Sequence, residues 1–110
     1  MCKIQLLFIC SRNKWRSLTA EKIFDKRNGY DVKSAGTEES ARIRVTEGHI
    51  GWADLIFVME KKHLRRLRDK FKTEIMNKTI ICLDIPDDYQ FMDDELIEIL
   101  ELRVSEYIEI

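Results

Sequence analysis

Residues 6–20 read LLFICSRNKWRSLTA, and most of what the sequence predicts about the chain depends on this stretch. The apolar run at residues 6–9 ends at Cys10, and a helix-like segment begins at Ser17. Cys10 and Arg16 therefore stand at the two ends of a short strand-to-helix loop. Such a loop offers backbone N–H groups, the positive end of a helix and a planar two-pronged donor to one oxyanion. The stretch predicts an oxyanion site with a thiol placed to attack.

Short β-favouring runs alternate with helical patterns along the chain. The sequence predicts strands at residues 4–9, 30–35, 54–59 and 79–83. It predicts helices at 17–27, 60–71 and 93–108, one or two helical turns at 46–51 capped by Thr46, and an ambiguous polar stretch at 38–44. This alternation is typical of a parallel sheet with helices on both faces. In such sheets ligands bind at the carboxyl ends of the strands, which the Cys10 loop and the loop at 86–89 both reach.

The length and charge of the chain limit the kinds of protein that it can be. With 110 residues we expect a single domain over residues 1–110, built on one hydrophobic core. The net charge is −1, with 45% hydrophobic and 35% charged residues, which is typical of a globular protein with a charged surface. This balance gives no reason to expect a nucleic-acid or membrane partner. The N-terminal apolar run is too short for a signal core or a membrane span, so we expect a cytoplasmic location.

The three cysteines, Cys2, Cys10 and Cys82, form neither an even disulfide framework nor the close pairs of a zinc site. Cys2 and Cys82 are interpreted as small buried hydrophobic residues, because that is the common state of a free cysteine. Cys10 differs, since it ends a strand and opens a loop.

The residues around Cys10 suit phosphoryl transfer. The donors that would bind the oxyanion also favour the thiolate, which is the nucleophilic form of a cysteine. Arg16 would grip two equatorial oxygens of the phosphoryl group. Ser17 would hydrogen-bond the sulfur, and Asn13 would lock the loop through its side-chain amide.

A covalent route also needs an acid to protonate the leaving oxygen. Asp87 and Asp88 lie in a loop after a strand, where carboxylates often take part in chemistry. A simple turn after the preceding proline is an equally good interpretation of the pair. His49 and His63 lie in helical segments and are interpreted as surface or partly buried residues, because neither has a pairing signal.

These residues resemble the low-molecular-weight protein tyrosine phosphatases, whose loop has the form Cys-x-x-Asn-x-x-Arg-Ser. Residues 10–17 here read CSRNKWRS. The resemblance continues with SAGT at 34–37, with VT at 45–46 before DLIFVM at 54–59, and with PDDY at 86–89, similar to the family's Pro-Asp-Pro-Tyr. It spans nearly the whole chain. Together with the pattern of elements, it implies an α/β fold: a single three-layer domain whose four-stranded parallel sheet has the order 2-1-3-4, with helices on both faces.

The resemblance implies a cysteine-dependent phosphatase that hydrolyses phosphotyrosine or another aryl phosphate through a phosphocysteine. Cys10 would be the nucleophile, Arg16 the phosphate clamp, and Asp87 rather than Asp88 the acid and then the base. The implied partner is a phosphorylated protein or a small aryl phosphate, with no metal or other cofactor. Tyr89 would form a wall for the aromatic ring. The expected substrate-binding residues are Ser11, Arg12, Asn13, Lys14, Trp15, Ser17 and Tyr89.

The sequence departs from the family's pattern at several positions. The chain is shorter than typical members, and the loss falls between residues 37 and 42, where the family has a further segment that walls the active site. Arg12 stands where a glycine is usual, and Trp15 stands where a second cysteine is common. Ser40 falls near the position of the family's histidine behind the loop. Asp88 replaces the second proline of the acid loop.

Other functions stay open. Arsenate reduction uses a similar oxyanion loop, but it needs a relay of thiols, and only Cys82 lies downstream. A phosphocysteine carrier would keep its phosphoryl group, and the loop arginine argues against that. A binding module would hold phosphorylated ligands without turnover, which the missing wall segment favours. The basic run at 61–70 is interpreted as a solvated helix face, with steering of an acidic protein or a nucleic acid as the alternative.

Overall fold

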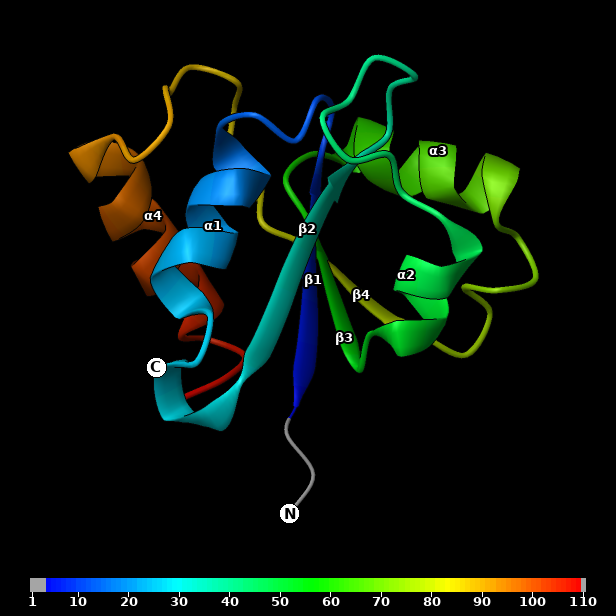
Figure 1. Ribbon diagram of the computed structural model, residues 1–110, viewed down its shortest axis with the longest axis horizontal. Helices are drawn as coiled ribbons and strands as arrows, with labels where there is room; N and C mark the ends of the chain where they lie inside the picture. The colour runs from blue at the N-terminus through cyan, green and yellow to red at the C-terminus, as the bar shows by residue number, and fades with distance from the viewer. Residues whose placement is uncertain (1–3, 110) are drawn as a thin grey trace.

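The computed structural model describes residues 4–109, which form a four-stranded sheet between two layers of helices (Figure 1). The elements are β1 (Gln5–Cys10), α1 (Arg16–Phe24), η1 (Arg27–Gly29), β2 (Asp31–Gly36), α2 (Glu47–Trp52), β3 (Leu55–Val58), α3 (Lys61–Lys70), β4 (Thr79–Cys82) and α4 (Asp94–Val104). All neighbouring strands pair in parallel, in the order β2-β1-β3-β4. The predicted α/β architecture and strand order are confirmed.

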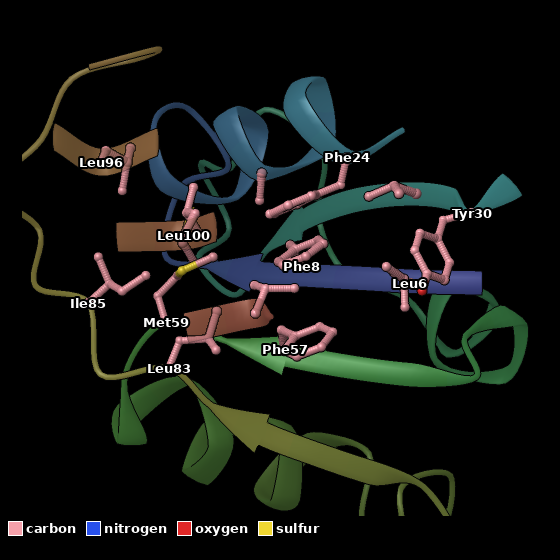
Figure 2. Packing of buried hydrophobic residues seen from close by; sticks show 14 residues of the cluster. Leu6, Phe8, Phe24, Tyr30, Phe57, Met59, Leu83, Ile85, Leu96 and Leu100 are labelled. Carbon is pink, nitrogen blue, oxygen red and sulfur yellow. The ribbon is translucent and has the colours of Figure 1, made fainter. Parts of the chain in front are cut away.

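Strand β1 is buried on both faces of the sheet. Phe8 faces the layer formed by α1 and α4, whereas Leu7 and Ile9 face α2 and α3. A strand covered on both sides needs apolar side chains at every position, which is why this segment is a continuous apolar run. Figure 2 shows Phe8 between Phe24 of α1 and Phe57 of β3, with ring centroids 5.6 and 5.0 Å from its own. This packing fixes the strand that ends at the thiol.

Helix α2 begins with a reciprocal cap. The hydroxyl of Thr46 accepts a hydrogen bond from the backbone N–H of His49 at 3.3 Å. In return, Nδ1 of His49 accepts from the backbone N–H of Thr46 at 3.0 Å. The two contacts satisfy groups that a helix start otherwise leaves unpaired. Thr46 is therefore the cap that the sequence predicts.

Two helices end earlier than the sequence predicts. Helix α1 stops at Phe24, because the chain then becomes extended and Lys26 takes a left-handed φ of 68°. Helix α4 stops at Val104, because the chain then turns: the N–H groups of Glu106 and Tyr107 donate to carbonyls three residues before them, at 3.3 and 2.9 Å. The α-helices span 6 to 11 residues, and none within residues 4–109 is long and apolar enough to cross a membrane.

Candidate active site

The loop between β1 and α1, residues 11–15, lies at the carboxyl edge of the sheet, at the top of Figure 1. A cavity of about 250 Å³ opens beside it. The cavity is lined by Cys10, Ser11, Arg12, Lys14, Trp15, Arg16, Glu38, Lys62 and Asp87. The fold therefore brings Cys10, Arg16 and Asp87 to one site from segments far apart in the sequence.

Two hydrogen-bonding groups surround the sulfur of Cys10. The Oγ of Ser17 lies 2.9 Å from Sγ, and the backbone N–H of Asn13 donates to Sγ at 3.2 Å. Asn13 also donates through Nδ2 to the hydroxyls of Ser17 and Ser34, both at 2.8 Å. Because the Ser17 hydroxyl accepts from Asn13, its own hydrogen is free to point at the sulfur. Both groups can therefore donate a hydrogen to the sulfur. Asn13 and Ser17 lie behind the sulfur rather than on the cavity wall.

The carbonyl groups of the loop point away from the cavity. Those of residues 10, 11 and 12 accept from the backbone N–H groups of residues 37, 38 and 42 at 2.9 to 3.0 Å. Nε of Arg42 reaches the next carbonyl, that of Asn13, at 3.3 Å. The N–H and C=O of one planar peptide unit point in opposite directions, so the N–H groups of residues 11–14 are turned inward. The short segment at 37–42 thus holds the loop with its N–H groups on the side of the sulfur.

Gly36 is the point at which β2 passes closest to the loop. A Cβ there would lie 2.6 Å from the carbonyl oxygen of Ser11 and 2.6 Å from the Cβ of Ala41. Contacts this short do not occur, so a glycine is needed for the close approach. Gly36 also pairs with Cys10 in the parallel ladder. The glycine of the SAGT motif therefore sets the distance between β2 and the loop.

The guanidinium of Arg16 is only 2% exposed and is held by three groups. Nη1 donates to Oε1 of Glu60 and, at 2.8 Å, to the carbonyl of Ile85. Nε lies 3.6 Å from Oδ1 of Asp87. Burial raises the pKa of Glu60, but the hydrogen bond and positive charge of Arg16 outweigh burial and lower it below its usual value. The ionised Glu60 thus orients Arg16 at the cavity, where a paired guanidinium has a fixed direction.

Asp87 lies in the connection between β4 and α4, and its side chain is 54% exposed. Asp87 lines the cavity. Asp88 is exposed and is not among the residues within 4–109 that line it. Of the two carboxylates, Asp87 is therefore the one beside Arg16. Neither is part of a metal site, since no cluster of three or more His, Cys, Asp or Glu within residues 4–109 could hold an ion.

Tyr89 does not take the place in the cavity wall that the sequence predicts for it. It is half-buried and packs against the core layer between the sheet and helices α1 and α4. The connection to α4 passes over α1 here, where the N–H of Met92 donates to the hydroxyl of Thr19 at 2.9 Å. Trp15, which is 44% exposed, is the aromatic side chain at the cavity.

His63 lies beneath the loop, and the prediction that it is a surface or partly buried residue is wrong. The ring is completely buried, with Nδ1 accepting from the backbone N–H of Glu60 at 3.0 Å. Nε2 lies 2.9 Å from Oγ of Ser11. Burial, and then the charge of Arg16, lowers the pKa of His63 to about 3, so the ring is neutral near pH 7. Since Nδ1 accepts, the single ring hydrogen is on Nε2 and is donated to Ser11.

Several solved structures with this architecture are phosphatases. No protein-family model and no curated protein matches the sequence. The tyrosine phosphatase Wzb from Escherichia coli K30, in complex with phosphate, is 20% identical and has a TM-score of 0.73. The likeness covers 96% of this chain and 96% of that chain.

Two further structures have the same arrangement of elements. The low molecular weight protein tyrosine phosphatase from T. tengcongensis is 19% identical, with a TM-score of 0.73 over 96% of this chain and 100% of that chain. The YwlE arginine phosphatase from Geobacillus stearothermophilus is 20% identical, with a TM-score of 0.69 over 94% and 91% of the two chains. The chain therefore has the fold of the low-molecular-weight protein tyrosine phosphatases.

Proposed function

We propose that this protein is a phosphatase that hydrolyses aryl phosphate monoesters, phosphotyrosine above all, through a phosphocysteine at Cys10. The observation that carries the proposal is a sulfur with two hydrogen-bonding partners, at a cavity lined also by Arg16 and Asp87. The inward N–H groups of the loop suit the oxygens of a phosphoryl group. A YwlE variant with a phosphorylated serine in its active site supports covalent phosphoryl transfer in this fold.

In the first step, the thiolate of Cys10 attacks phosphorus, an S–P bond forms and the bond to the leaving oxygen breaks. Loop N–H groups and Arg16 bind the equatorial oxygens, on which negative charge is spread in the transition state. Asp87, in its acid form, gives its proton to the leaving oxygen, which departs as a neutral hydroxyl. The exposed position of Asp87 beside Arg16 suits this role, because the leaving group must face the open side of the cavity.

In the second step, the carboxylate of Asp87 takes a proton from water while the water oxygen bonds to phosphorus. The S–P bond then breaks and its electron pair returns to Cys10 as a thiolate. Ser17 stabilises this leaving sulfur, since its hydroxyl hydrogen is free to point at Sγ. Inorganic phosphate is released and the starting state is restored.

The cavity rim favours an aromatic over a guanidino phosphate. Lys14 and Lys62 line it together with Trp15. The two ammonium groups repel the cation of a phosphoarginine side chain, whereas the indole offers a flat apolar surface to an aromatic ring. These contacts support a phosphotyrosine substrate, although YwlE, a protein of the same fold, is an arginine phosphatase.

Arsenate reduction has less support. Cys10 belongs to the core layer shared with α1 and α4, whereas Cys82 is half-buried on β4 and packs in the opposite layer with α2 and α3. The sheet therefore lies between the two described thiols, and a disulfide relay between them would have to pass through it. Cys2 lies outside the described residues.

An Asp87→Asn variant tests the role of the acid. We expect kcat/KM for phosphotyrosine, whose leaving group is poor, to fall by about 100-fold, the typical loss for a general acid. This ratio reports the first step alone, whereas kcat also contains the second step, in which Asp87 is the base for either substrate. For 2,4-dinitrophenyl phosphate we expect a loss below about tenfold, because that leaving group hardly needs a proton. Steady-state kinetics on both substrates measures the difference. Asp88→Asn is the matched control and should keep both rates. An equal loss on both substrates, or the larger loss in Asp88→Asn, contradicts the assignment.

A further inference from the structure

The charges of this chain are divided between the two faces of the sheet. Helix α3 carries six Lys or Arg side chains and one Asp, a net charge of +5, although the whole chain has −1. Helix α4 carries four carboxylates and one arginine, a net charge of −3. Figure 1 shows α3 and α4 on opposite sides of the sheet. A nearly neutral chain thus presents one strongly basic face, and that face adjoins the cavity.

Two cations at the cavity are available to a ligand. The exposed ammonium of Lys14 forms no ion pair or hydrogen bond with any described residue, and Lys14 lines the cavity. Lys62, in the first turn of α3, is 45% exposed, and its ion pair with Glu60 is long at 3.9 Å, because the same carboxylate oxygen is bound by Arg16. Arg12 differs, because it is paired with Glu38 at 3.2 Å.

Arg66 continues the line of charge away from the cavity. It lies four residues after Lys62 on α3, so the two share one side of the helix. Its guanidinium donates to the neutral hydroxyl of Thr37 at 3.1 Å, a contact that leaves the positive charge unbalanced. The four-residue step from Lys62 to Arg66 rises about 6 Å along the helix. Alternate residues of an extended peptide are about 6.6 Å apart, so their side chains match this spacing.

We propose that the substrate is an acidic phosphopeptide, bound in an extended form with carboxylates at alternate positions beside the phosphorylated side chain. Those carboxylates contact Lys14, Lys62 and Arg66, here called the cationic row. The inference rests on the proposed phosphatase function and names its substrate class. A peptide fits better than a nucleic acid, because Glu38 and Asp87 at the same rim repel a continuous polyanion. A peptide carries only a few carboxylates, and these can lie along the cationic row without passing Glu38 or Asp87.

The test compares kcat/KM for two phosphotyrosine peptides of equal length, with Glu or with Ala at the alternate flanking positions. In low salt we expect kcat/KM for the Glu peptide to be about fivefold higher, because its carboxylates form two or three partly exposed ion pairs. The preference should fall toward one in Lys62→Ala/Arg66→Ala and as salt rises. Lys22→Ala, which removes an exposed lysine of α1, is the matched control and should keep the preference.

Each outcome supports or overturns the inference. Equal kcat/KM for the two peptides in the wild type overturns it, as does a preference that survives the double substitution. An RNA oligonucleotide is added as a competitor. If it inhibits the wild type but not Lys62→Ala/Arg66→Ala, and the two peptides are hydrolysed equally, the cationic row binds nucleic acid instead. Hydrolysis of 4-nitrophenyl phosphate, which has no flanking charges, tests the proposed function separately.

Ser11 lines the cavity beside the nucleophile, and its hydroxyl has a fixed hydrogen-bond partner. His63 donates its one ring hydrogen to Oγ of Ser11, because its other nitrogen accepts from Glu60. The hydroxyl therefore cannot donate to the ring, and none of the described residues accepts its hydrogen. Ser11 is 8% exposed, so the free direction for that hydrogen is toward the cavity.

We infer that Ser11 donates its hydroxyl hydrogen to an oxygen of the bound phosphoryl group, with His63 as the residue that positions it. This inference also rests on the proposed function. The hydroxyl adds one side-chain donor to the inward N–H groups of the loop. Its hydrogen is fixed in direction before substrate arrives, because the neutral ring of His63 donates to the same oxygen.

A double-mutant cycle tests this arrangement. We expect Ser11→Ala to lower kcat about tenfold, as for one hydrogen bond to a charged group, and Ser11→Thr to keep most of the activity. His63→Gln should lower kcat in the wild type but by less than about twofold in the Ser11→Ala background, because the hydroxyl that it orients is gone. Equal losses in both backgrounds, or full activity of Ser11→Ala, overturns the inference. Activity on 4-nitrophenyl phosphate in the wild type checks the proposed function separately.

Discussion

A Cys10→Ser variant is expected to lose turnover of 4-nitrophenyl phosphate and phosphotyrosine by roughly 10⁴-fold, the scale of losing a covalent nucleophile. The serine hydroxyl stays protonated near neutral pH, and no described side chain next to Cys10 is a base that could remove its proton. Ser17 and the N–H of Asn13 serve the sulfur only by donating hydrogens to it. Neither group is placed to take the proton of a hydroxyl, so attack by the serine is expected to be slow.

The measurement separates chemistry from binding. Steady-state assays give the loss in kcat, and isothermal titration with inorganic phosphate shows whether the cradle still binds its oxyanion. Cys82→Ser is the matched control, since Cys82 lies on β4 in the opposite core layer, and it should keep its activity. Full turnover by Cys10→Ser would show that the loop binds phosphate for a different nucleophile. Phosphate binding by a wild type without turnover would point to the binding module.

The second large effect is expected for Arg16→Lys, which keeps the charge but removes the planar fork. We expect kcat/KM to fall by about 10² to 10³, as when one donor to a developing oxyanion is lost. An ammonium cannot bind two phosphoryl oxygens while it also satisfies Glu60 and the carbonyl of Ile85. The substitution should also lower the free energy of unfolding by about 1 to 3 kcal/mol, because buried polar groups lose partners.

Arg103→Lys provides the control for this loss of stability. Arg103 donates through Nη1 to the carbonyls of Leu83 and Asp84, much as Arg16 donates to that of Ile85. Its replacement should lower the midpoint of urea unfolding, by an amount comparable with Arg16→Lys, and leave kcat/KM unchanged. If both variants lose activity to the same extent, the effect of Arg16 comes from folding and its role as a phosphate clamp is rejected.

The strands and the thiol loop could be predicted because local sequence decides them. The run at residues 6–9 is apolar at every position, which is typical of a strand covered by helices on both sides. The spacing from Cys10 to Arg16 fits a loop between a strand and a helix. The helix ends were less predictable, because apolar spacing does not encode the turns that follow Phe24 and Val104.

The roles of His63 and Tyr89 could not be predicted, since tertiary packing decides both. His63 stands three residues after Glu60, and this spacing is a local signal for a reciprocal helix cap. The cap fixes one ring nitrogen, but the partner of the other, Ser11, is 52 residues away in the sequence. Tyr89 follows the acid in sequence, yet the path of the chain over α1 places it against the core.

The close approach at Gly36 makes the geometry of the Cys10 loop depend on the correct pairing of β2. Because Gly36 and Cys10 are paired in the ladder, a slip of β2 by one residue would bring a Cβ, of Ala35 or of Thr37, against the carbonyl of Ser11. The slip would also misalign the bonds from residues 37–42 that turn the loop amides inward. A molecule with the wrong strand register would thus be strained and would also lack the loop geometry on which the proposed catalysis depends.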